Sequence, residues 1–386
     1  MVRIPNRMVE EIRKDADARG ANGSLSSAIV DYMFEAGLFK LFVPTALGGS
    51  GLTLPEALRV FEQASWADGS FGWLATIGSG GGFFSATLPS EQAQELFGHD
   101  KALVAGSGHP NGIAVPVEGG YLVSGRWQYC SGAVYASLFT ANCRIRKAGG
   151  AQETGGVAGL ARSGGSMGED DLTSSTGSDY SAGEEAIRSF AFLPDQVRIV
   201  RDWNAFGMKA TESHSIVVDN AFVPTERTFD IMSEPRFDDP IFRYPFLPFA
   251  QTSFAAVCLG VCRHFIEEAR VFAEAREADW ANSRPGRLAA LRDEVEKGGA
   301  ALLVSADRFY ETVERTWDAF VMNGTLDEVQ SDEVGAICKG MARDALAHAH
   351  MIFPLLGMTA LMEDLPLNRI WRDLHTVAQH SALSSV

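Results

Sequence analysis

The chain has 386 residues and a formal net charge of −16 at pH 7, from 33 Lys and Arg against 49 Asp and Glu. Hydrophobic residues make up 46% and charged residues 21%, which is typical of a folded soluble protein. The acidic balance argues against nucleic acid as a partner, because binding to its phosphates needs clustered Lys and Arg. At this length we expect two or three domains, with a core that needs no disulfides.

Cysteine usage and the termini indicate a compartment. The five cysteines are an odd number without a Cys-x-x-Cys pair, which favours free thiols over a disulfide framework or a zinc site. The N-terminus is charged and lacks the apolar segment of a secretory signal. The longest apolar run, Phe254 to Cys262, is too short to cross a bilayer. We therefore expect a cytoplasmic protein without a membrane partner.

Helices are expected over most of residues 1–103, the first predicted domain. Pro5 to Arg19 is charged and amphipathic, and Ser26 to Ala36 carries apolar residues at helical spacing. Leu54 to Ala67 reads as a helix with a proline in its first turn. Ser90 opens a Ser-x-x-Gln pattern, which predicts a capping box at the start of another helix.

Strand patterns replace helical ones in residues 104–230, the second predicted domain. Residues 115–145 alternate and are rich in Val, Tyr, Trp and Phe, and Gly119-Gly120 predicts a hairpin turn. The Gly- and Ser-rich stretch 149–185 has almost no period, so we interpret it as a long surface insertion, with room for a short strand near Val157 to Leu160. A lid over a pocket is the alternative.

The third predicted domain, residues 231–386, is helical again. Its predicted helices cover residues 249–278, Leu288 to Trp317, Asp332 to Met351 and Arg369 to Ala382. An order of helices, strands and then a helix bundle predicts an α+β protein with segregated domains rather than alternating βαβ units.

Several common site patterns are missing from the sequence. No GxGxxG follows a predicted strand and opens a helix, which argues against a nicotinamide-binding Rossmann unit. The sequence also lacks GxxxxGK[ST], HExxH and GxSxG. His348 and His350 lie two apart, so on a helix they point to different sides and cannot share a metal.

The segment GRWQYCSG at the end of a predicted strand is the first candidate site. Trp127 and Ser131 are four residues apart and share a face if the strand is regular. Gly132 then ends the strand and allows a ligand close to the backbone. The alternative is a core tryptophan followed by a Ser-Gly turn.

Two further segments carry polar side chains at regular spacing. One is FGMKATESHSIVVDNAFVP, from Phe206 to Pro224. The other is PLNRIWRDLHTVAQH near the C-terminus, where cationic, acidic, hydroxyl and imidazole side chains recur along one helical stripe: Arg369, Arg372, Asp373, Thr376 and His380. A solvated helix face is the alternative interpretation of that stripe.

With LFVPTALGGSGL, ADGSFGW and GGYLVSGRWQYCSG, these segments resemble the acyl-CoA dehydrogenase superfamily over nearly the full length of the chain. The chain looks most similar to the flavin-dependent monooxygenase branch. That branch includes the oxygenase components of p-hydroxyphenylacetate and secosteroid hydroxylases, dibenzothiophene monooxygenase and sugar nitrososynthases. The resemblance implies an N-terminal helical domain, a central β-barrel-like domain and a C-terminal four-helix bundle, assembled as a homotetramer.

The resemblance also implies roles for individual residues. Ser131 would bond to flavin N5, and His380 would serve as general acid or base, since a histidine of ordinary pKa suits both roles near neutral pH. Trp127 would pack against the flavin ring. Arg263 and Arg276 would contact flavin phosphate, with ordinary surface charges as the alternative. The remaining implied cofactor contacts are Gly132, Thr211, Ser213 and Gly357.

The implied reaction uses reduced flavin, FMN or FAD, supplied by a separate flavin reductase. With O₂ it passes through a C4a-hydroperoxide and oxygenates a small aromatic, amine or sulfur substrate. The alternative is a dehydrogenase or oxidase acting on a CoA thioester. That chemistry needs a carboxylate base, and the C-terminal segment contains no Glu after Glu363. A third possibility is a flavin-free scaffold of the same fold.

Overall fold

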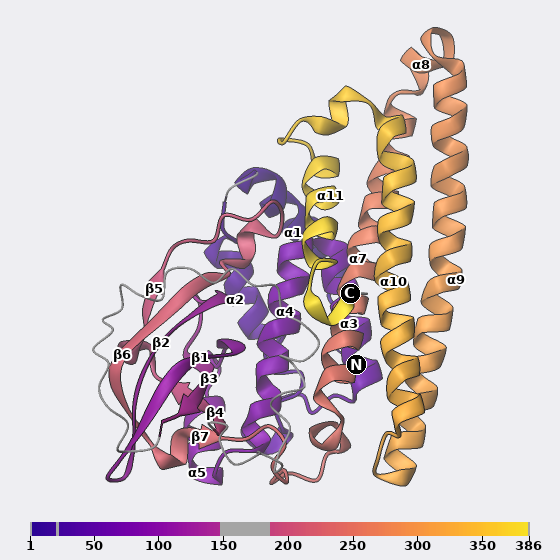
Figure 1. The fold of residues 1–386 in the computed structure, drawn as a ribbon. Coiled ribbons are helices and arrows are strands. Elements are labelled where there is room, and N and C mark those ends of the chain that lie inside the picture. The colour runs from indigo at the N-terminus through magenta and orange to yellow at the C-terminus, as the bar shows by residue number, and fades with distance from the viewer. Residues whose placement is uncertain (1, 21–22, 147–185, 385–386) are drawn as a thin grey trace.

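The computed structural model describes residues 2–20, 23–146 and 186–384 (Figure 1). The insertion expected at 149–185, with its short strand, lies outside these residues. A sheet occupies one side of the molecule and long C-terminal helices the other, with the N-terminal helices between them (Figure 1). Helices give way to strands after Phe97, and strands to helices after Phe229. These changes fall near the boundaries expected at 103 and 230, whose use as domain boundaries stays a prediction.

The N-terminal helices form where the sequence predicts them. They are α1 (Asn6–Arg19), α2 (Ser27–Glu35), α3 (Leu54–Ala67), α4 (Gly69–Gly81) and α5 (Ser90–Phe97). The Thr53–Glu56 capping box and a first-turn proline begin α3, and Asp68 ends α3 and caps α4 by accepting a hydrogen bond from the Phe71 N–H. The capping box expected at Ser90 is wrong, because Pro89 occupies the N-cap position.

The central strands form one seven-stranded sheet in the order β5-β6-β2-β1-β3-β4-β7 among the residues described. They are β1 (Val104–Val117), β2 (Gly120–Cys130), β3 (Leu138–Ile145), β4 (Ile187–Phe192), β5 (Arg198–Val200), β6 (His214–Pro224) and β7 (Thr228–Phe229). β1 pairs antiparallel with β2, and Val117 faces Gly120. The turn is therefore Glu118-Gly119, one residue earlier than predicted. The expected barrel-like domain is thus a sheet, with β5 and β7 as its edge strands.

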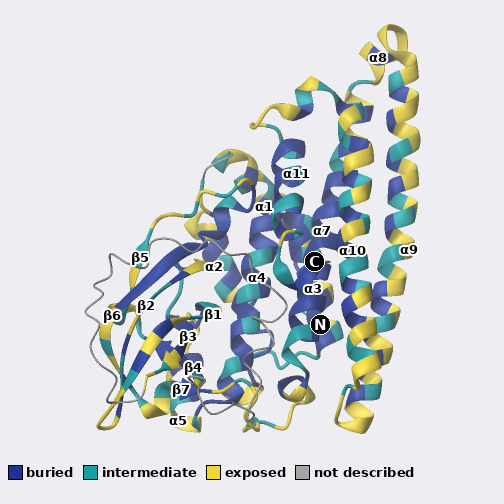
Figure 2. Cartoon of the chain, viewed as in Figure 1, coloured by how far each residue is buried: buried dark blue, intermediate teal, exposed yellow. Residues whose placement is uncertain are grey.

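The C-terminal helices are α7 (Phe246–Ala275), α8 (Glu277–Ser283), α9 (Pro285–Asn323), α10 (Glu328–Leu356) and α11 (Pro366–Val377). Helix α7 is buried along much of its length, whereas α9 exposes one side to solvent (Figure 2). Among the described helices, α7 has the length and mean hydropathy (1.3) to cross a membrane, but 83% of its apolar window is buried inside the protein. That burial is typical of a core helix.

Two details of packing place the site. A Cβ on Gly260 of α7 would lie 2.3 Å from the Glu62 carbonyl oxygen of α3, so only glycine allows these helices to approach so closely. Helix α11 ends at Val377 rather than at the predicted Ala382, and the chain turns before the short helix η9 (Ser381–Leu383). His380 therefore lies in the turn, off the helical stripe.

Candidate active site

Segments from all three parts of the chain meet at the end of β2. Ser131 follows that strand, Trp73 comes from α4, and Phe254 comes from α7. The short helix η5 (Lys209–Thr211) and the residue before β6, Ser213, lie beside Ser131. A site at this position can therefore combine groups from a sheet, a buried helix and the C-terminal turn.

Three buried hydroxyl groups form a continuous chain of hydrogen bonds, called here the hydroxyl chain: Ser131, Ser213 and Thr211. The Ser131 and Ser213 Oγ atoms lie 2.8 Å apart, and Ser213 Oγ lies 2.6 Å from Thr211 Oγ1. At one end, Thr211 Oγ1 donates to the Met208 carbonyl at 2.7 Å. At the other, Ser131 Oγ accepts from the indole N–H of Trp73 at 2.9 Å. All three hydroxyl residues are less than a tenth exposed, so bulk water does not compete for these bonds.

Unusual backbone conformations shape this region. Gly132 has a φ of +77°, and its N–H donates to the Thr211 carbonyl at 2.8 Å, which fastens the end of β2 to η5. Tyr129 also has a positive φ, +63°, where the β2–β6 register shifts. The strand is therefore irregular between Trp127 and Ser131, and the expectation that the two side chains share a face is wrong.

Aromatic rings surround His380 next to the hydroxyl chain. The His380 ring lies 4.3 Å from that of Phe254 and 5.9 Å from that of Trp73, between ring centroids. Trp73 thus joins the two halves of the site, since its indole N–H reaches Ser131 while its ring packs near His380. The arrangement suits a flat aromatic group more than a highly charged one.

His380 is neutral at physiological pH. Burial, with a smaller contribution from the nearby His109, lowers its pKa to about 4. Its Nδ1 accepts the Ala382 N–H at 3.2 Å, so the proton of the neutral ring is assigned to Nε2. The expectation that His380 has an ordinary histidine pKa, and can act as acid or base near neutral pH, is therefore wrong. Neutral His380 offers a hydrogen-bond donor at Nε2, and it can take up a proton at Nδ1 only by giving up the Ala382 bond.

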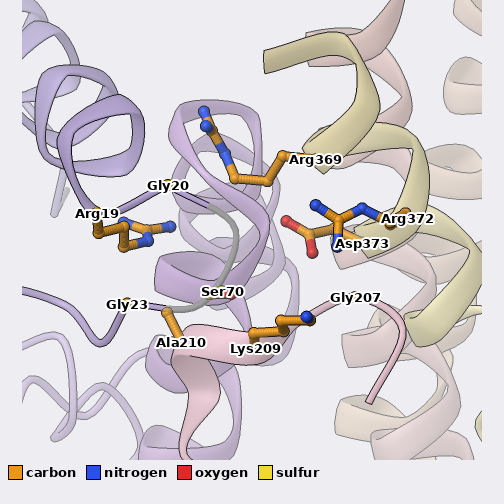
Figure 3. A pocket seen from close by; sticks show the side chains of 10 residues that line it. All are labelled: Arg19, Gly20, Gly23, Ser70, Gly207, Lys209, Ala210, Arg369, Arg372 and Asp373. Atoms are coloured by element: carbon orange, nitrogen blue, oxygen red, sulfur yellow. The ribbon is translucent and has the colours of Figure 1, made fainter. Parts of the chain in front are cut away.

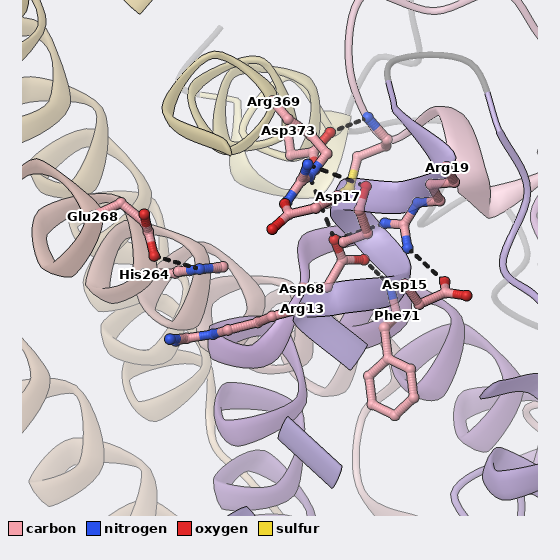
Figure 4. A network of polar contacts seen from close by, with 12 residues as sticks. Arg13, Asp15, Asp17, Arg19, Asp68, Phe71, His264, Glu268, Arg369 and Asp373 are labelled. Carbon is pink, nitrogen blue, oxygen red and sulfur yellow. Dashed lines mark hydrogen bonds and ion pairs between the residues drawn. The ribbon is translucent and has the colours of Figure 1, made fainter. Parts of the chain in front are cut away.

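A second polar cluster lies at the start of α4 and contains ionised groups instead of hydroxyls (Figure 4). We call it the charged network: Arg19, Asp68, Arg369 and Asp373. The Asp68 carboxylate bonds Arg19 at 2.6 Å and lies 3.9 Å from Arg369. Burial alone would raise the Asp68 pKa, but the charges of Arg19 and Arg369 outweigh it and hold that pKa below its usual value. Asp68 thus remains ionised.

Asp373 connects the charged network to the hydroxyl chain. Asp373 Oδ1 accepts the Met208 N–H at 2.5 Å, and the Met208 carbonyl accepts the Thr211 hydroxyl. Burial and the negative charge of Asp68 raise the Asp373 pKa to about 6. Met208 is therefore held from both sides, and its φ of +53° is maintained by these bonds.

A small cavity lies beside the charged network (Figure 3). Ser70, Lys209 and Arg372 contribute to its wall together with Arg19, Arg369 and Asp373. Its volume is about 10 Å³, which is room for about one water molecule. A flavin ring does not fit there.

The acidic side chain closest in sequence to Ser213 is turned to other partners. Glu212 bonds Ser24 through one carboxylate oxygen and His214 Nε2 through the other, at 2.6 Å for the latter. His214 Nδ1 in turn accepts the Trp203 N–H at 3.0 Å. Glu212 therefore fastens the N-terminal segment to the start of β6 and is unavailable as a base for a thioester substrate.

The structure corrects the assignment of Trp127. Its side chain is fully buried in the core of the sheet, and its indole N–H donates to the Asn142 carbonyl at 3.0 Å. It also packs near Phe192, with ring centroids 6.0 Å apart. The alternative interpretation, a core tryptophan followed by a Ser-Gly turn, describes this position. Trp73, the last residue of the segment ADGSFGW, bonds Ser131 instead.

The other predicted residues divide into two groups. The structure brings Ser131, Gly132, Thr211, Ser213 and His380 together. Arg263, Arg276 and Gly357 lie elsewhere in the chain. At ~1.5 Å per residue, Arg263 and Arg276 are ~13 Å and ~33 Å along α7 from Phe254.

Each of the distant residues has a local structural role. Arg263 pairs with Glu62 of α3, and the Arg276 guanidinium lies 5.1 Å from the Phe272 ring. Gly357 ends α10 with a φ of +81°, and a Cβ there would lie 2.7 Å from Arg287 Nη2.

The residues at the end of β2 fit a reduced flavin. Ser131 Oγ accepts the Trp73 indole N–H and shares a hydrogen bond with Ser213 Oγ in which either hydroxyl can donate, so it can make one further hydrogen bond. Gly132 permits a close backbone approach, and the indole of Trp73 offers an apolar surface beside it. Reduced flavin carries a proton on N5 and presents a flat aromatic face, so its chemistry matches this set of groups.

Comparisons with known proteins agree with the fold. Residues 5–95 match the acyl-CoA dehydrogenase N-terminal domain, and residues 252–385 match the acyl-CoA dehydrogenase C-terminal domain. Indole-3-acetate monooxygenase from Pseudomonas putida is 29% identical over 94% of this chain and 85% of its own length. The flavin-dependent monooxygenase oxygenase subunit HsaA from Rhodococcus jostii (strain RHA1) is 25% identical over 90% of this chain and 85% of its own length.

A solved structure supports the same architecture. The structure of XiaF from Streptomyces sp., in complex with FADH₂ and glycerol, superposes with a TM-score of 0.78 at 18% identity, covering 98% of this chain and 90% of that one. That likeness shows the fold. Because the two domain matches span more than half of the residues and the similar proteins over nearly the full length are monooxygenases, the chain belongs to the acyl-CoA dehydrogenase superfamily, in its flavin-dependent monooxygenase branch.

Proposed function

We propose that this protein is the oxygenase component of a two-component flavin monooxygenase. It takes reduced flavin, FMN or FAD, from a separate reductase and uses O₂ to oxygenate a small aromatic substrate. Bound reduced flavin supplies the two electrons that activate O₂. One oxygen atom enters the substrate and the other leaves as water.

The observation that carries the proposal is the uncharged site at the end of β2. Ser131 can make one further hydrogen bond, to flavin N5, and neutral His380 has a donor at Nε2 near the rings of Trp73 and Phe254. An acyl-CoA dehydrogenase needs a carboxylate base at the reacting carbon. The neighbouring acids Glu212 and Asp373 are instead bonded to His214 and the Met208 N–H.

In this proposal each residue has a defined task. Ser131 holds N5 and its proton, His380 donates a hydrogen bond to the reacting oxygen or to the substrate, and Trp73 and Phe254 exclude water. The aromatic lining favours a flat ring as substrate. Indole-3-acetate is the first probe, because a relative that is 29% identical is named for it.

The proposal includes assembly and location. Large apolar side chains are exposed on α9 and at the start of α10: Leu303, Val304, Val321, Met322 and Val329. They support a homotetramer, in which Arg276 and Gly357 of one chain would reach a flavin of the next. Light scattering is expected to give four times the 41.6 kDa chain mass. The five buried, free cysteines support a cytoplasmic location.

The test of the function uses photoreduced FMN, ¹⁸O₂ and indole-3-acetate. We expect a product that carries one ¹⁸O atom. The Ser131→Ala variant should convert a larger share of the consumed O₂ to hydrogen peroxide than wild type does. If O₂ yields only peroxide with indole-3-acetate and with a panel of indoles and phenols, the proposal fails. Reduction of bound FAD by butyryl-CoA would instead support the dehydrogenase.

A further inference from the structure

Two histidines from neighbouring helices meet at the surface of the C-terminal part of the protein. His350 lies on α10 and His375 on α11, and their Nε2 atoms are 2.7 Å apart. His350 is exposed and His375 is half-buried, so an ion from solvent can reach the pair. The sequence excludes a metal shared by His348 and His350, but the fold gives His350 a partner 25 residues further along the chain.

The proton of neutral His375 is assigned from its backbone contact. His375 Nδ1 lies 2.7 Å from the Trp371 carbonyl oxygen, which can only accept, so Nδ1 carries the proton. Its Nε2 therefore has a lone pair, which accepts the Nε2–H of His350 in the 2.7 Å contact. A free lone pair on one ring nitrogen, with the other N–H bonded to a backbone carbonyl, is the arrangement of a metal-ligating histidine.

The surroundings hold His375 in place and leave His350 able to adjust. The His375 ring centroid lies 3.9 Å from that of Trp371, which stacks on Phe353 with centroids 4.5 Å apart. Two nitrogens bound to one ion at about 2.0–2.1 Å each lie about 3.0–3.4 Å from one another. Because His350 is exposed, its ring can move outward by the roughly half an ångström that this requires, and its proton can pass to Nδ1 through solvent.

We propose that His350 and His375 bind a divalent transition-metal ion. Imidazole nitrogen suits Cu²⁺, Ni²⁺ and Zn²⁺, whereas Mg²⁺ and Ca²⁺ prefer oxygen ligands. Among the residues that the structure describes, no group of three or more His, Cys, Asp or Glu side chains could hold a metal ion. The chain thus supplies two ligands and water completes the coordination, so we expect reversible binding that is tightest for Cu²⁺.

A bound ion would join α10 directly to α11, the helix that also carries Arg369 and Asp373 of the charged network. Unfolding separates the two histidines, so an ion that binds the folded pair stabilises the folded protein. Melting temperature is therefore a readout of this site that depends on neither flavin nor catalysis.

The test is a calorimetric titration of the full-length protein, without an affinity tag, with Ni²⁺ and with Mg²⁺. We expect one Ni²⁺ to bind per chain and to raise the melting temperature, and we expect no binding of Mg²⁺ to the pair. The EPR spectrum of the protein loaded with one Cu²⁺ per chain should show coupling to two imidazole nitrogens. The EPR measurement needs no variant, so it holds even if a substitution damages the fold.

Matched variants test whether the ion binds at the pair. His350→Asn and His375→Asn each remove one ligand and should weaken Ni²⁺ binding by at least about tenfold, since even changes to groups that only support a ligand cost that much. Both should also abolish the rise in melting temperature. His348→Asn removes a histidine two residues from His350 on the same helix and should leave both quantities unchanged.

An affinity for Ni²⁺ that falls in both ligand variants but not in His348→Asn supports the inference. Wild-type affinity in either ligand variant, or a Cu²⁺ spectrum with coupling to one nitrogen or none, overturns it. A wild-type protein that binds neither Ni²⁺ nor Cu²⁺ also overturns it. Each of these results leaves the proposed function untouched, because none of the measurements uses flavin.

Discussion

The hydroxyl chain and the charged network both bond to Met208, but the first consists of neutral hydroxyl groups and the second of arginine and aspartate side chains. Thr211 bonds the Met208 carbonyl with a neutral hydroxyl, and Asp373 bonds the Met208 N–H with a buried carboxyl group. Ionised groups fix positions strongly but are costly to bury, whereas hydroxyls can face a ligand without a charge. We therefore expect the charged network to stabilise the fold and the hydroxyl chain to act in the proposed flavin site.

The largest expected effect is on stability, from Asp68→Ala in the charged network. Removing this carboxylate takes away a buried partner of Arg19 and Arg369, which keep only Asp15 and Asp17. We expect the free energy of unfolding to fall by about 3 kcal/mol. Urea unfolding measures it. The control Asp31→Ala breaks an exposed pair with Lys101 and should cost less than about 1 kcal/mol. Equal losses in the two variants would contradict a structural role for Asp68.

The next effect is on catalysis, from His380→Asn beside the hydroxyl chain. If neutral His380 donates to the reacting oxygen or substrate, product formation at saturating reduced flavin should fall by roughly 100-fold. Flavin affinity should change little, because the imidazole is assigned to the substrate side. An unchanged product yield in single turnovers would show that His380 is only a partly buried turn residue.

Substitutions of two tryptophans, Trp127 and Trp73, should have intermediate effects, one on stability and the other on flavin binding. Trp127→Phe removes the bond to the Asn142 carbonyl in the sheet core and should cost about 1–3 kcal/mol of stability, with unchanged flavin affinity. Trp73→Phe removes the bond to Ser131 and should weaken the binding of reduced flavin instead. The opposite pattern, measured by urea unfolding and anaerobic titration, would restore Trp127 as the flavin contact.

The smallest expected effect is the pH dependence of stability from His380. Its pKa is lowered to about 4 in the folded protein, so between pH 6.5 and 4 the unfolded chain binds the proton more readily. The stability that neutral His380 contributes is complete above pH 6.5 and is lost as the pH falls toward 4. Allowing for partial exposure, the loss is about 1–2 kcal/mol. Unfolding curves of wild type and His380→Asn should diverge in that window, and parallel curves would count against a lowered pKa.

The sequence predicts helices best where local signals agree. The Thr53–Glu56 capping box and the proline that follows Leu54 define α3 without help from the rest of the fold. The end of α11 was harder, since the polar spacing continues through His380 although the helix stops at Val377. Helical spacing alone therefore grouped Asp373 with His380. In the structure Asp373 belongs to the charged network, whereas His380 lies beside Phe254 and Trp73.

The family motifs grouped Ser131, Gly132, Thr211 and Ser213, and the structure places them together. Their role in binding flavin stays a prediction. Trp127 could not be distinguished from Trp73 by sequence, because the irregular backbone at Tyr129 decides which ring faces Ser131. Likewise, the pKa of His380 depends on burial against Phe254 and on His109, residues far away in the sequence.

The central claim is that the flavin ring binds at the end of β2, with N5 against Ser131. A crystal structure of the protein soaked anaerobically with FMNH₂ tests it directly. We predict that flavin N5 lies about 3 Å from Ser131 Oγ, with the ring beside the indole of Trp73, which keeps its bond to Ser131. A flavin ring bound at any other place, with Ser131 still bonded only to Trp73 and Ser213, would contradict the account.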